Sequence, residues 1–370
     1  MRIVVIGGLA SSLINFRGPL LEAMVDRGHE VIACAPDAPK DVRVKLAGMA
    51  VEYCHVPIER SGMNPAGDLW AALSLFRIFQ KRQPNIVLGY TAKPVVWGCL
   101  AARAAQVPAS FAMIEGLGYA FIGDDSFKQR FLHHIVIALY RAALSHTKAV
   151  FFLNPDDLFE FRKKRLLSTS TQSVRINGIG VDLKHYSPAS LPKSPVFLLM
   201  ARLLADKGIR EYREAARRIR ARYPDARFLL AGGFDSNPAA IKEAEIRKWK
   251  EEGSLDYLGE LDDVRPALAQ SRIYVLPSYR EGTPRTVLEA MSTGRPIITT
   301  DAPGCRETVQ DGVNGFLVPV KDAGALSLAM EKFITKPDLA ESMGKESRRI
   351  AEEKYDVHKV NQVILSAMGL

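Results

Sequence analysis

The chain has 370 residues, 47% hydrophobic and 25% charged, which predicts a folded protein of two domains and excludes a largely disordered chain. Its four cysteines stand far apart without a CxxC or histidine pairing, so neither a disulfide framework nor a zinc site is expected, and the cytoplasm is the natural compartment. Residues 1–190 hold 22 Lys and Arg against 15 Asp and Glu, or +7 of the net charge of +9, and without a nucleic-acid-binding motif this excess favours an anionic membrane or a phosphorylated substrate.

The first half of the chain alternates short β-type runs with longer amphipathic stretches. Residues 1–8 predict a strand that enters a turn, because a short apolar run is followed by two glycines. The segment has no Ala-x-Ala cleavage pattern, so a signal peptide is not expected. This alternation is typical of a parallel sheet covered by helices. Strands are predicted at Ile3–Gly7, Glu30–Ala35, Val51–Val56, Ile86–Gly89, Ser110–Ile114 and Ala149–Leu153, with a helix over Pro65–Gln80.

A basic and apolar stretch follows at Phe127–Arg141, with helical spacing. Its most apolar part, Phe131–Leu144, contains two histidines and an arginine and is shorter than the roughly 20 residues that span a bilayer, so no transmembrane helix is predicted. Two interpretations remain open: a core-facing helix with a basic rim, or a helix that rests on an anionic membrane. A second basic cluster, Arg162–Arg165, is expected on the same side.

The second half restarts the alternation after a polar, proline-containing segment that ends at Pro195. We expect a hinge near Asp182, which divides the chain into domains 1–182 and 183–355, with residues 356–370 forming a helix that returns to the first domain. Ligands of open α/β sheets bind beyond the carboxyl ends of the strands, so two facing sheets would share one cleft. Strands are predicted at Val196–Met200, Arg227–Ala231, Leu255–Leu258, Ile273–Leu276, Ile297–Thr299 and Phe316–Val318.

The segment Ile273–Met291 combines a buried strand, a turn and a helix that begins near Pro284. Amides of the first helical turn lack intrahelical partners, and with the helix dipole they form an anion site that fits a diphosphate. Glu281, ahead of the helix, can accept hydrogen bonds from sugar hydroxyls, and Glu289 from a ribose. The alternative is that Glu281 caps the helix and Glu289 is an ordinary surface residue.

Two cations follow the strand Val196–Met200. Arg202 offers a planar fork and Lys207 a point charge, so together they can neutralise the charge on a departing nucleoside diphosphate and replace a metal. Alternatively, Lys207 is a surface residue without a functional role near a helix N-terminus, although a cation there opposes the dipole unless an anion is bound. Further on, Gly232 and Gly233 predict a close approach of a ligand to the backbone, and the segment around Leu258 can surround a base with main-chain groups.

These motifs resemble, in order and spacing, the retaining glycosyltransferases of family 4, which have the α/β GT-B fold of two Rossmann-like parallel-sheet domains facing a central cleft. The resemblance covers essentially the whole chain, including the Gly7-Gly8 turn and the Asn177–Asp182 hinge, and the Glu-x7-Glu block with the Arg/Lys pair is its most specific part. The motifs are Arg202, Lys207-Gly208, Leu230–Gly233, Leu258-Gly259 and Glu281 with Glu289.

The resemblance implies that Arg202 and Lys207 bind the donor diphosphate, that Glu281 holds the sugar ring, and that no divalent metal or other cofactor is needed. It further implies retention of configuration, with the leaving phosphate oxygen taking the acceptor proton. The donor-binding residues expected on this basis are Gly8, Gly233, Leu258, Gly282, Thr283, Arg285, Thr286, Val287 and Glu289.

The acceptor is expected to meet a glycine-rich loop after Ile114, where many relatives have a histidine and this chain has Glu115. Glu115, Gly116 and Gly118 either bind sugar hydroxyls or form a structural turn with a solvated glutamate. The Gly-Leu-Gly version looks like that of bacterial enzymes that build O-antigen, capsule or N-glycan precursors on lipid carriers. In the first loop, Ser11, Ser12, Asn15 and Arg17 are expected to meet the acceptor or its diphosphate, and Phe16 to pack inside.

The leading hypothesis is a retaining hexosyltransferase that moves a hexose or N-acetylhexosamine from a UDP-sugar to a saccharide on polyprenyl diphosphate. It would work in the cytoplasm, on the inner face of the membrane, with peripheral contact through the basic first domain and without nucleic acid. Two alternatives stay open: a GT-B-type sugar-nucleotide epimerase, which needs no acceptor, and a non-catalytic protein that binds nucleotide sugar or phospholipid.

Overall fold

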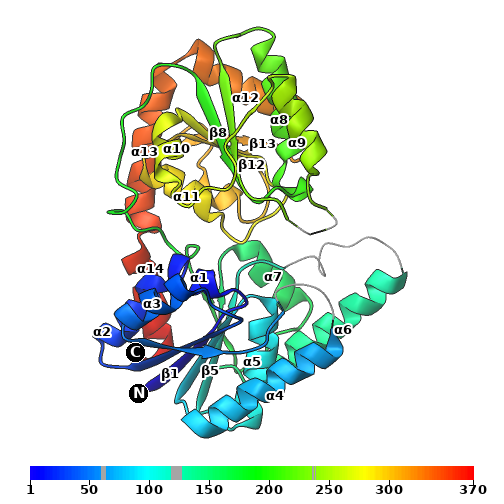
Figure 1. Cartoon of the computed structure of the whole chain (residues 1–370), viewed down its shortest axis with the longest axis vertical. Helices are drawn as coiled ribbons and strands as arrows, with labels where there is room; N and C mark the ends of the chain where they lie inside the picture. Colours follow the sequence, from blue (N-terminus) through cyan, green and yellow to red (C-terminus); the bar gives the residue numbers. More distant parts are fainter. Residues whose placement is uncertain (60–63, 118–126, 236, 238) are drawn as a thin grey trace. The chain divides into compact units, whose positions relative to one another are not determined.

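The computed structural model describes residues 1–59, 64–117, 127–235, 237 and 239–370, and for residues 127–132 the helical backbone alone (Figure 1). The chain divides into two compact units. The first unit contains Met1–Ile179 together with His358–Leu370, and the second contains Gly180–Val357.

The first unit is built on a seven-stranded, fully parallel sheet with the strand order β3-β2-β1-β4-β5-β6-β7. Successive residues of the central strand point to opposite faces: Ile3 and Val5 enter one core, and Val4 and Ile6 enter the other. The strands are β1 Arg2–Ile6, β2 Glu30–Ala35, β3 Val51–His55, β4 Ile86–Tyr90, β5 Ala109–Ile114, β6 Ala149–Phe152 and β7 Gln172–Arg175.

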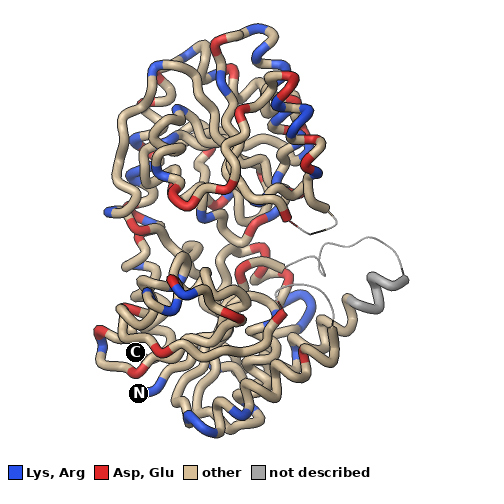
Figure 2. The backbone as a smooth tube through the Cα atoms, viewed as in Figure 1, with Lys and Arg blue, Asp and Glu red and all other residues tan. Residues whose placement is uncertain are grey.

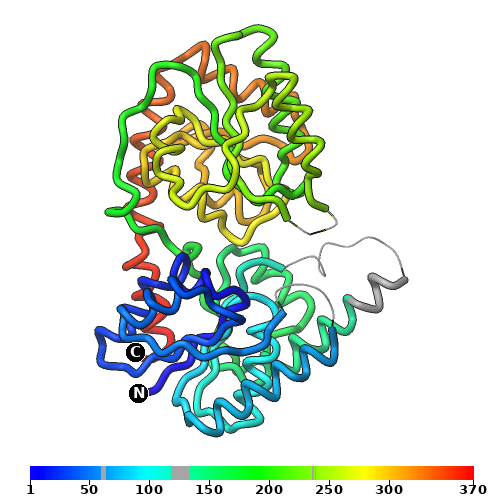
Figure 3. Tube along the Cα trace, in the orientation of Figure 1, coloured from blue at the N-terminus to red at the C-terminus, as the bar shows by residue number. Residues whose placement is uncertain are grey.

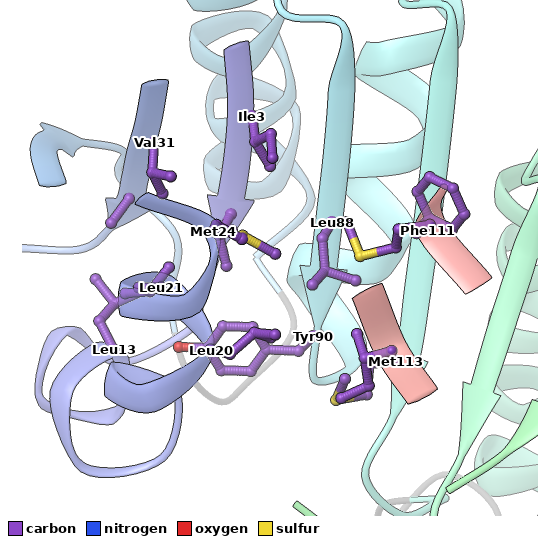
Figure 4. Packing of buried hydrophobic residues seen from close by; sticks show 14 of the residues in the cluster. Ile3, Leu13, Leu20, Leu21, Met24, Val31, Leu88, Tyr90, Phe111 and Met113 are labelled. Carbon is purple, nitrogen blue, oxygen red and sulfur yellow. The ribbon is translucent and has the colours of Figure 1, made fainter. Parts of the chain in front are cut away.

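Helices cover both faces of this sheet. One core joins α1 and α2 to the sheet, where Leu13, Leu20 and Met24 pack beside Leu88 and Tyr90 (Figure 4). The other core lies under α4, α5 and α6. The helices are α1 Ala10–Asn15, α2 Gly18–Asp26, α3 Lys40–Gly48, α4 Pro65–Arg82, α5 Ala92–Ala104, α6 Phe127–Leu144 and α7 Pro155–Lys163.

The last helix, α14 (Val357–Met368), belongs to the first unit although it ends the chain. Its apolar side chains recur at helical spacing and share the core of α1 and α2, through Val360, Ile364, Leu365 and Met368. The red C-terminal segment therefore lies against the blue N-terminal segments in Figure 3.

The second unit repeats the plan with a six-stranded parallel sheet in the order β10-β9-β8-β11-β12-β13. Its strands are β8 Val196–Met200, β9 Arg227–Ala231, β10 Asp256–Tyr257, β11 Ile273–Leu276, β12 Ile297–Thr300 and β13 Gly315–Val318. Its helices are α8 Ile209–Arg220, α9 Glu243–Glu251, α10 Arg265–Gln270, α11 Arg285–Ser292, α12 Ala323–Thr335 and α13 Asp338–Lys354, with 3₁₀ turns at Ala205–Lys207 and Arg306–Thr308.

The proline-containing segment before β8 is fastened to the second unit by arginine side chains. The guanidinium of Arg295 is fully buried and donates to the carbonyls of Ala189 at 2.9 Å and Leu268 at 2.9 Å. This burial lowers the pKa of Arg295 to about 10. Arg348 donates to the carbonyl of Leu183 at 3.2 Å, so the segment is anchored from its first residues.

Two elements differ from the sequence-based expectation. Strand β7 was not predicted, because its sequence Gln-Ser-Val-Arg has no apolar run and the strand lies at the sheet edge. Strand β10 is two residues long, shorter than the predicted Leu255–Leu258. Across the helices that the structure describes, none has the length and apolar character needed to cross a bilayer.

Candidate active site

The candidate site of the second unit is organised by the loop between β11 and α11, residues 277–284. Neighbouring loops hold it from both sides: the Tyr279 amide donates to the carbonyl of Asp206 at 2.8 Å, and the Glu281 amide donates to that of Pro303 at 2.9 Å. These partners follow β8 and β12, the two strands that flank β11 in the sheet. Strand order therefore fixes where Glu281 lies.

Two glycines permit this close approach of three loops. Gly208 has φ +70°, and a Cβ there would overlap the carbonyl oxygen of Pro277. Gly304 has φ +80°, and a Cβ there would overlap the carbonyl oxygen of Glu281. A side chain at either position would push the loop away, and the positive φ adds a cost of its own.

Lys207 and Glu281 form an ion pair at the centre of this loop cluster, with 2.5 Å between Nζ and Oε1. The hydroxyl of Ser278 donates to the same carboxylate oxygen at 2.8 Å. Only 14% of the Lys207 side chain and 16% of the Glu281 side chain are exposed. Burial alone would lower the pKa of Lys207, but attraction to Glu281 and their hydrogen bond outweigh it and raise the pKa. Lys207 therefore stays protonated and paired with the Glu281 carboxylate.

Arg202 does not share this carboxylate. Its guanidinium is half-exposed and pairs with Asp235, with 2.8 Å between Nη1 and Oδ2. The two predicted cations therefore stand near one another on loops after β8, but each is held by a different acid. Asp235 and Ser278 were missed by the sequence analysis, although Asp235 lies two residues after the Gly232-Gly233 motif.

The start of α11 corrects one expectation. Pro284 is the N-cap residue rather than part of the first turn, and its carbonyl accepts from the Val287 amide at 3.1 Å. The prediction that the Val287 amide lacks an intrahelical partner is therefore wrong, because the first turn tightens to a 3₁₀-type bond. The loop contains Gly282 and Thr283, and α11 begins with Arg285 and Thr286.

Glu289 is buried, so it is not an ordinary surface residue. Its Oε1 pairs with Nε of Arg285 at 2.9 Å, one helical turn earlier. Burial raises the pKa of Glu289, whereas Arg285 and a hydrogen bond from Tyr186 oppose the rise. Tyr186 comes from the segment before β8, and nothing in its local sequence identified it.

The glycine motif after β9 packs against the protein's own chain. Gly232 has φ +152°, and a Cβ there would overlap the Ala201 carbonyl, while one on Gly233 would lie 2.7 Å from the Glu260 carboxylate. These glycines therefore allow adjacent segments to pack, rather than leaving open backbone. Beside them, Leu258 and Phe234 expose apolar side chains.

In the first unit, Arg17 and Glu115 form an ion pair that joins the start of α2 to the end of β5. Ser11, Ser12 and Asn15 belong to α1, so the loop expected there is a helix. Arg17 is 2% exposed, and its guanidinium lies 4.5 Å from the ring centroid of Tyr90. The Tyr90 hydroxyl in turn contacts that of Ser12 at 2.7 Å. Arg17 therefore orients Glu115, and direct contact of Arg17 with a ligand would require this pair to open, whereas 20% of the Glu115 side chain remains exposed.

Other predicted residues of the first unit have mixed outcomes. Phe16 is 39% exposed, so the expectation that it packs inside is wrong: its neighbour Arg17 turns inward instead. Gly7 and Gly8 lie beside the ends of β4 and α5, where a Cβ on Gly7 would overlap the Tyr90 hydroxyl. Gly116 follows Glu115 with φ +136°, and Gly118 lies outside the described residues.

The two basic clusters lie on the same side of the first unit, as predicted. Nε of Arg141 donates to the carbonyl of Arg165 at 3.2 Å, and Nζ of Lys164 lies 3.3 Å from Nε2 of His133. Lys and Arg gather at the end of α7 in Figure 2. Arg141 of α6 therefore lies beside the Arg162–Arg165 cluster at the end of α7, and we call these five residues the cationic surface of α6 and α7.

Comparison with known families divides the chain as the two sheets do. Residues 17–166 match the family described as glycosyl transferase 4-like domain, and residues 183–350 match that described as glycosyl transferases group 1. A similar protein is N,N'-diacetylbacillosaminyl-diphospho-undecaprenol alpha-1,3-N-acetylgalactosaminyltransferase of Campylobacter jejuni, 28% identical over 98% of this chain and 96% of that protein. Another is UDP-Gal:alpha-D-GlcNAc-diphosphoundecaprenol alpha-1,3-galactosyltransferase of Escherichia coli, 27% identical over 92% of both chains.

Solved structures share the fold at low sequence identity. Sucrose-phosphate synthase of Thermosynechococcus elongatus has a TM-score of 0.82 at 18% identity, over 100% of this chain and 98% of the other. HepE of Anabaena, solved with UDP and glucose, has a TM-score of 0.79 at 16% identity, over 100% and 99% of the two chains. Both support the predicted GT-B architecture of two parallel-sheet domains.

Replacing Gly304 by alanine should displace the Glu281 loop, because the added Cβ overlaps the Glu281 carbonyl. The control is Gly312→Ala, where φ is +76° but no atom lies within 4 Å, so it carries the φ cost of about 1–2 kcal/mol alone. Urea unfolding should show a clearly larger loss for Gly304→Ala, on the order of 3 kcal/mol. Equal losses in the two variants would contradict this packing role.

The Lys207–Glu281 pair should make stability fall at alkaline pH. Because folding raises the pKa of Lys207 above its ordinary 10.5, its contribution is present below that value and is lost as pH rises through the folded pKa. The difference in unfolding free energy between wild type and Lys207→Met should therefore shrink as pH increases above about 10. Chemical denaturation measures this difference in unfolding free energy from about pH 8 to about pH 11.5, roughly one unit above the ordinary pKa of lysine. A difference that grows with pH would refute the ion pair.

Proposed function

Since the chain belongs to the group 1 glycosyltransferases and carries a glycosyl transferase 4-like domain, we propose that it moves a hexose or N-acetylhexosamine from a UDP-sugar to a saccharide linked to polyprenyl diphosphate. The buried Lys207–Glu281 pair carries this proposal, because it sets a fixed cation beside a carboxylate at the carboxyl edge of a parallel sheet. Two relatives named for transfer to sugars on diphosphoundecaprenol support the acceptor class.

In this proposal Lys207 and Arg202 stabilise the negative charge that develops on UDP as the glycosidic bond breaks. Lys207 is partly desolvated, which strengthens its attraction to a phosphate oxygen, and its bond to Glu281 holds it in position before the donor arrives. Arg202 is half-exposed, so it can turn from Asp235 to the diphosphate at little cost.

We propose that Glu281 accepts hydrogen bonds from the hydroxyls of the transferred sugar. Glu289 is held by Arg285 and Tyr186, which favours the ribose as its partner at the buried end of the site. Because carboxylates accept but do not donate when ionised, both positions suit hydroxyl groups rather than phosphates.

The transfer is proposed to proceed with retention. The bond between the anomeric carbon and the phosphate oxygen breaks, the acceptor oxygen bonds to the same face of that carbon, and the acceptor proton passes to the leaving oxygen. Two cations would supply the positive charge that a divalent metal can supply. Within the described ranges no three His, Cys, Asp or Glu side chains are grouped as metal ligands.

On the acceptor side we propose that Glu115 binds acceptor hydroxyls and that Arg17 positions it. Arg17 reaches Glu115 from the start of α2 while its guanidinium packs on Tyr90, so the carboxylate is fixed before the acceptor binds. Gly116, with φ +136°, lets the chain turn immediately after it.

The enzymatic test uses UDP-N-acetylglucosamine and UDP-galactose as donors and a synthetic polyprenyl-diphosphate saccharide as acceptor. Lys207→Ala removes stabilisation of the charge that develops on UDP, and Glu281→Gln removes the carboxylate that holds Lys207 and accepts from the sugar, so each should lower kcat about 10²–10³-fold. Lys248→Ala, an exposed lysine on α9, is the matched control and should keep wild-type activity. Release of UDP should require the acceptor; turnover of donor alone would favour an epimerase, and full activity in Lys207→Ala would overturn the site.

We further propose peripheral contact with an anionic membrane through the cationic surface of α6 and α7. Arg162→Glu with Lys163→Glu should weaken sedimentation with vesicles of anionic phospholipid, because each basic residue near the surface contributes about 1 kcal/mol. Arg247→Glu with Lys248→Glu, two exposed cations of α9, makes the same charge change in the second unit. Equal binding of both double variants would contradict a surface specific to α6 and α7.

A further inference from the structure

A cavity of about 410 Å³ opens in the first unit, away from the Arg17–Glu115 pair. It lies where β2 and β3 end and α4 begins, and Trp70, His55, Asp37 and Glu59 line it. Its volume falls in the range of sites for small ligands, and the carboxyl edge of a parallel sheet is where such ligands bind. Neither the donor residues nor Glu115 account for it.

The walls of this cavity are fixed by hydrogen bonds. The hydroxyl of Tyr53 donates to the Pro36 carbonyl at 2.8 Å and accepts from the Ala38 amide at 3.1 Å, which fastens the loop after β2. On the opposite side, Nδ2 of Asn64 donates to Oε1 of Glu59 at 3.0 Å and ties Glu59 to the start of α4. These bonds hold Pro36 and Glu59, two of the lining residues, in place.

Trp70 presents a large apolar ring to this cavity and remains 51% exposed. The guanidinium of Arg77, two helical turns later, lies 5.4 Å from the ring centroid and restrains it. Across the cavity, Nε2 of His55 lies 3.2 Å from Oδ1 of Asp37. The cavity thus combines one aromatic ring with a small set of hydrogen-bonding groups, a lining that suits a ligand with both apolar and hydroxyl surfaces.

The charges of the cavity select among ligands. Asp37 and Glu59 contribute two exposed carboxylates, which accept hydrogen bonds from hydroxyls and, weakened by solvent screening, disfavour phosphate and anionic lipid headgroups. A sugar ring offers hydroxyl donors at its rim and C–H groups on its face, where an indole can pack. The lining therefore favours a neutral saccharide over the diphosphate of a lipid carrier.

We propose that this cavity is a subsite for a sugar of the acceptor glycan other than the one that is extended. The inference rests on the proposed function, because the acceptor is taken to be a saccharide. Strand β3 stands four strand positions from β5, which carries Glu115, and at about 4.8 Å per position this is roughly 19 Å. Binding at the subsite would therefore depend on the length or identity of a glycan with several sugars.

Binding can be tested with the full-length protein and free oligosaccharides, without donor. Tri-N-acetylchitotriose and maltotriose, each at about 10 mM to exceed a Kd of about 1 mM, would be followed by saturation-transfer NMR. At least one should receive saturation from wild type and from Trp70→Phe, and lose it with Trp70→Ala. Phe159→Ala removes another exposed aromatic ring, from α7 (62% exposed, against 51% for Trp70), and should leave the signal intact.

Two anionic probes test whether the cavity binds a phosphate or an anionic lipid instead of a saccharide. Inorganic pyrophosphate should not compete with the saccharide, and vesicles of anionic phospholipid should bind wild type and Trp70→Ala equally. Absence of saturation transfer from both oligosaccharides, or equal transfer in wild type and Trp70→Ala, would overturn the subsite. Vesicle binding that depends on Trp70 would replace it with a membrane contact.

Kinetics separate this proposal from the proposed function. For Trp70→Ala, the ratio of KM for a tetrasaccharide acceptor to KM for a monosaccharide acceptor should rise about tenfold, which corresponds to about 1.4 kcal/mol. An unchanged ratio would refute the subsite while leaving the glycosyltransferase assignment in place. Conversely, the wild type could bind saccharide through Trp70 and yet transfer no sugar. That result would support the saccharide subsite and reject the proposed function.

Discussion

The ion pair between Lys207 and Glu281 exists because three strands of the second sheet are neighbours in space although they are distant in sequence. Strand β11 lies between β8 and β12, so the loop that carries Glu281 touches the loop of Lys207 on one side and Pro303 on the other. Gly208 and Gly304 make room for these contacts. The position of the charged groups is thus a consequence of strand order, and any shift in the loops would separate the pair.

The first unit uses the same device with different residues. Arg17 and Glu115 follow different strands and meet at the carboxyl edge of the sheet, where Tyr90 supports the guanidinium. In both units a buried cation fixes a carboxylate before any ligand is present. Such preorganisation reduces the free energy spent on ordering side chains during binding or reaction. The two pairs differ in exposure, since Arg17 is more deeply buried than Lys207.

Charge is distributed over the molecule in a way that matches the proposed substrates. Cations gather on α6 and α7 and at the candidate diphosphate site, whereas carboxylates line the cavity beside Trp70. In this scheme the lipid diphosphate, the nucleotide and the glycan each meet a surface of suitable charge and polarity.

The sequence by itself determined the α/β class and most strands to within a residue or two, and it singled out the four charged residues of the candidate site in the second unit. Apolar runs bounded by turns are local signals, and β2, β8, β9 and β11 were predicted with their observed bounds. The edge strand β7 was not predicted, because it is only partly buried and its sequence has no apolar run. Only the tertiary structure decided which charges pair: that Lys207 meets Glu281 while Arg202 meets Asp235, that Arg17 turns inward while Phe16 is exposed, and that Tyr186 reaches Glu289. These contacts join residues from different strands and loops, and the order of strands in a sheet carries no signal in local sequence.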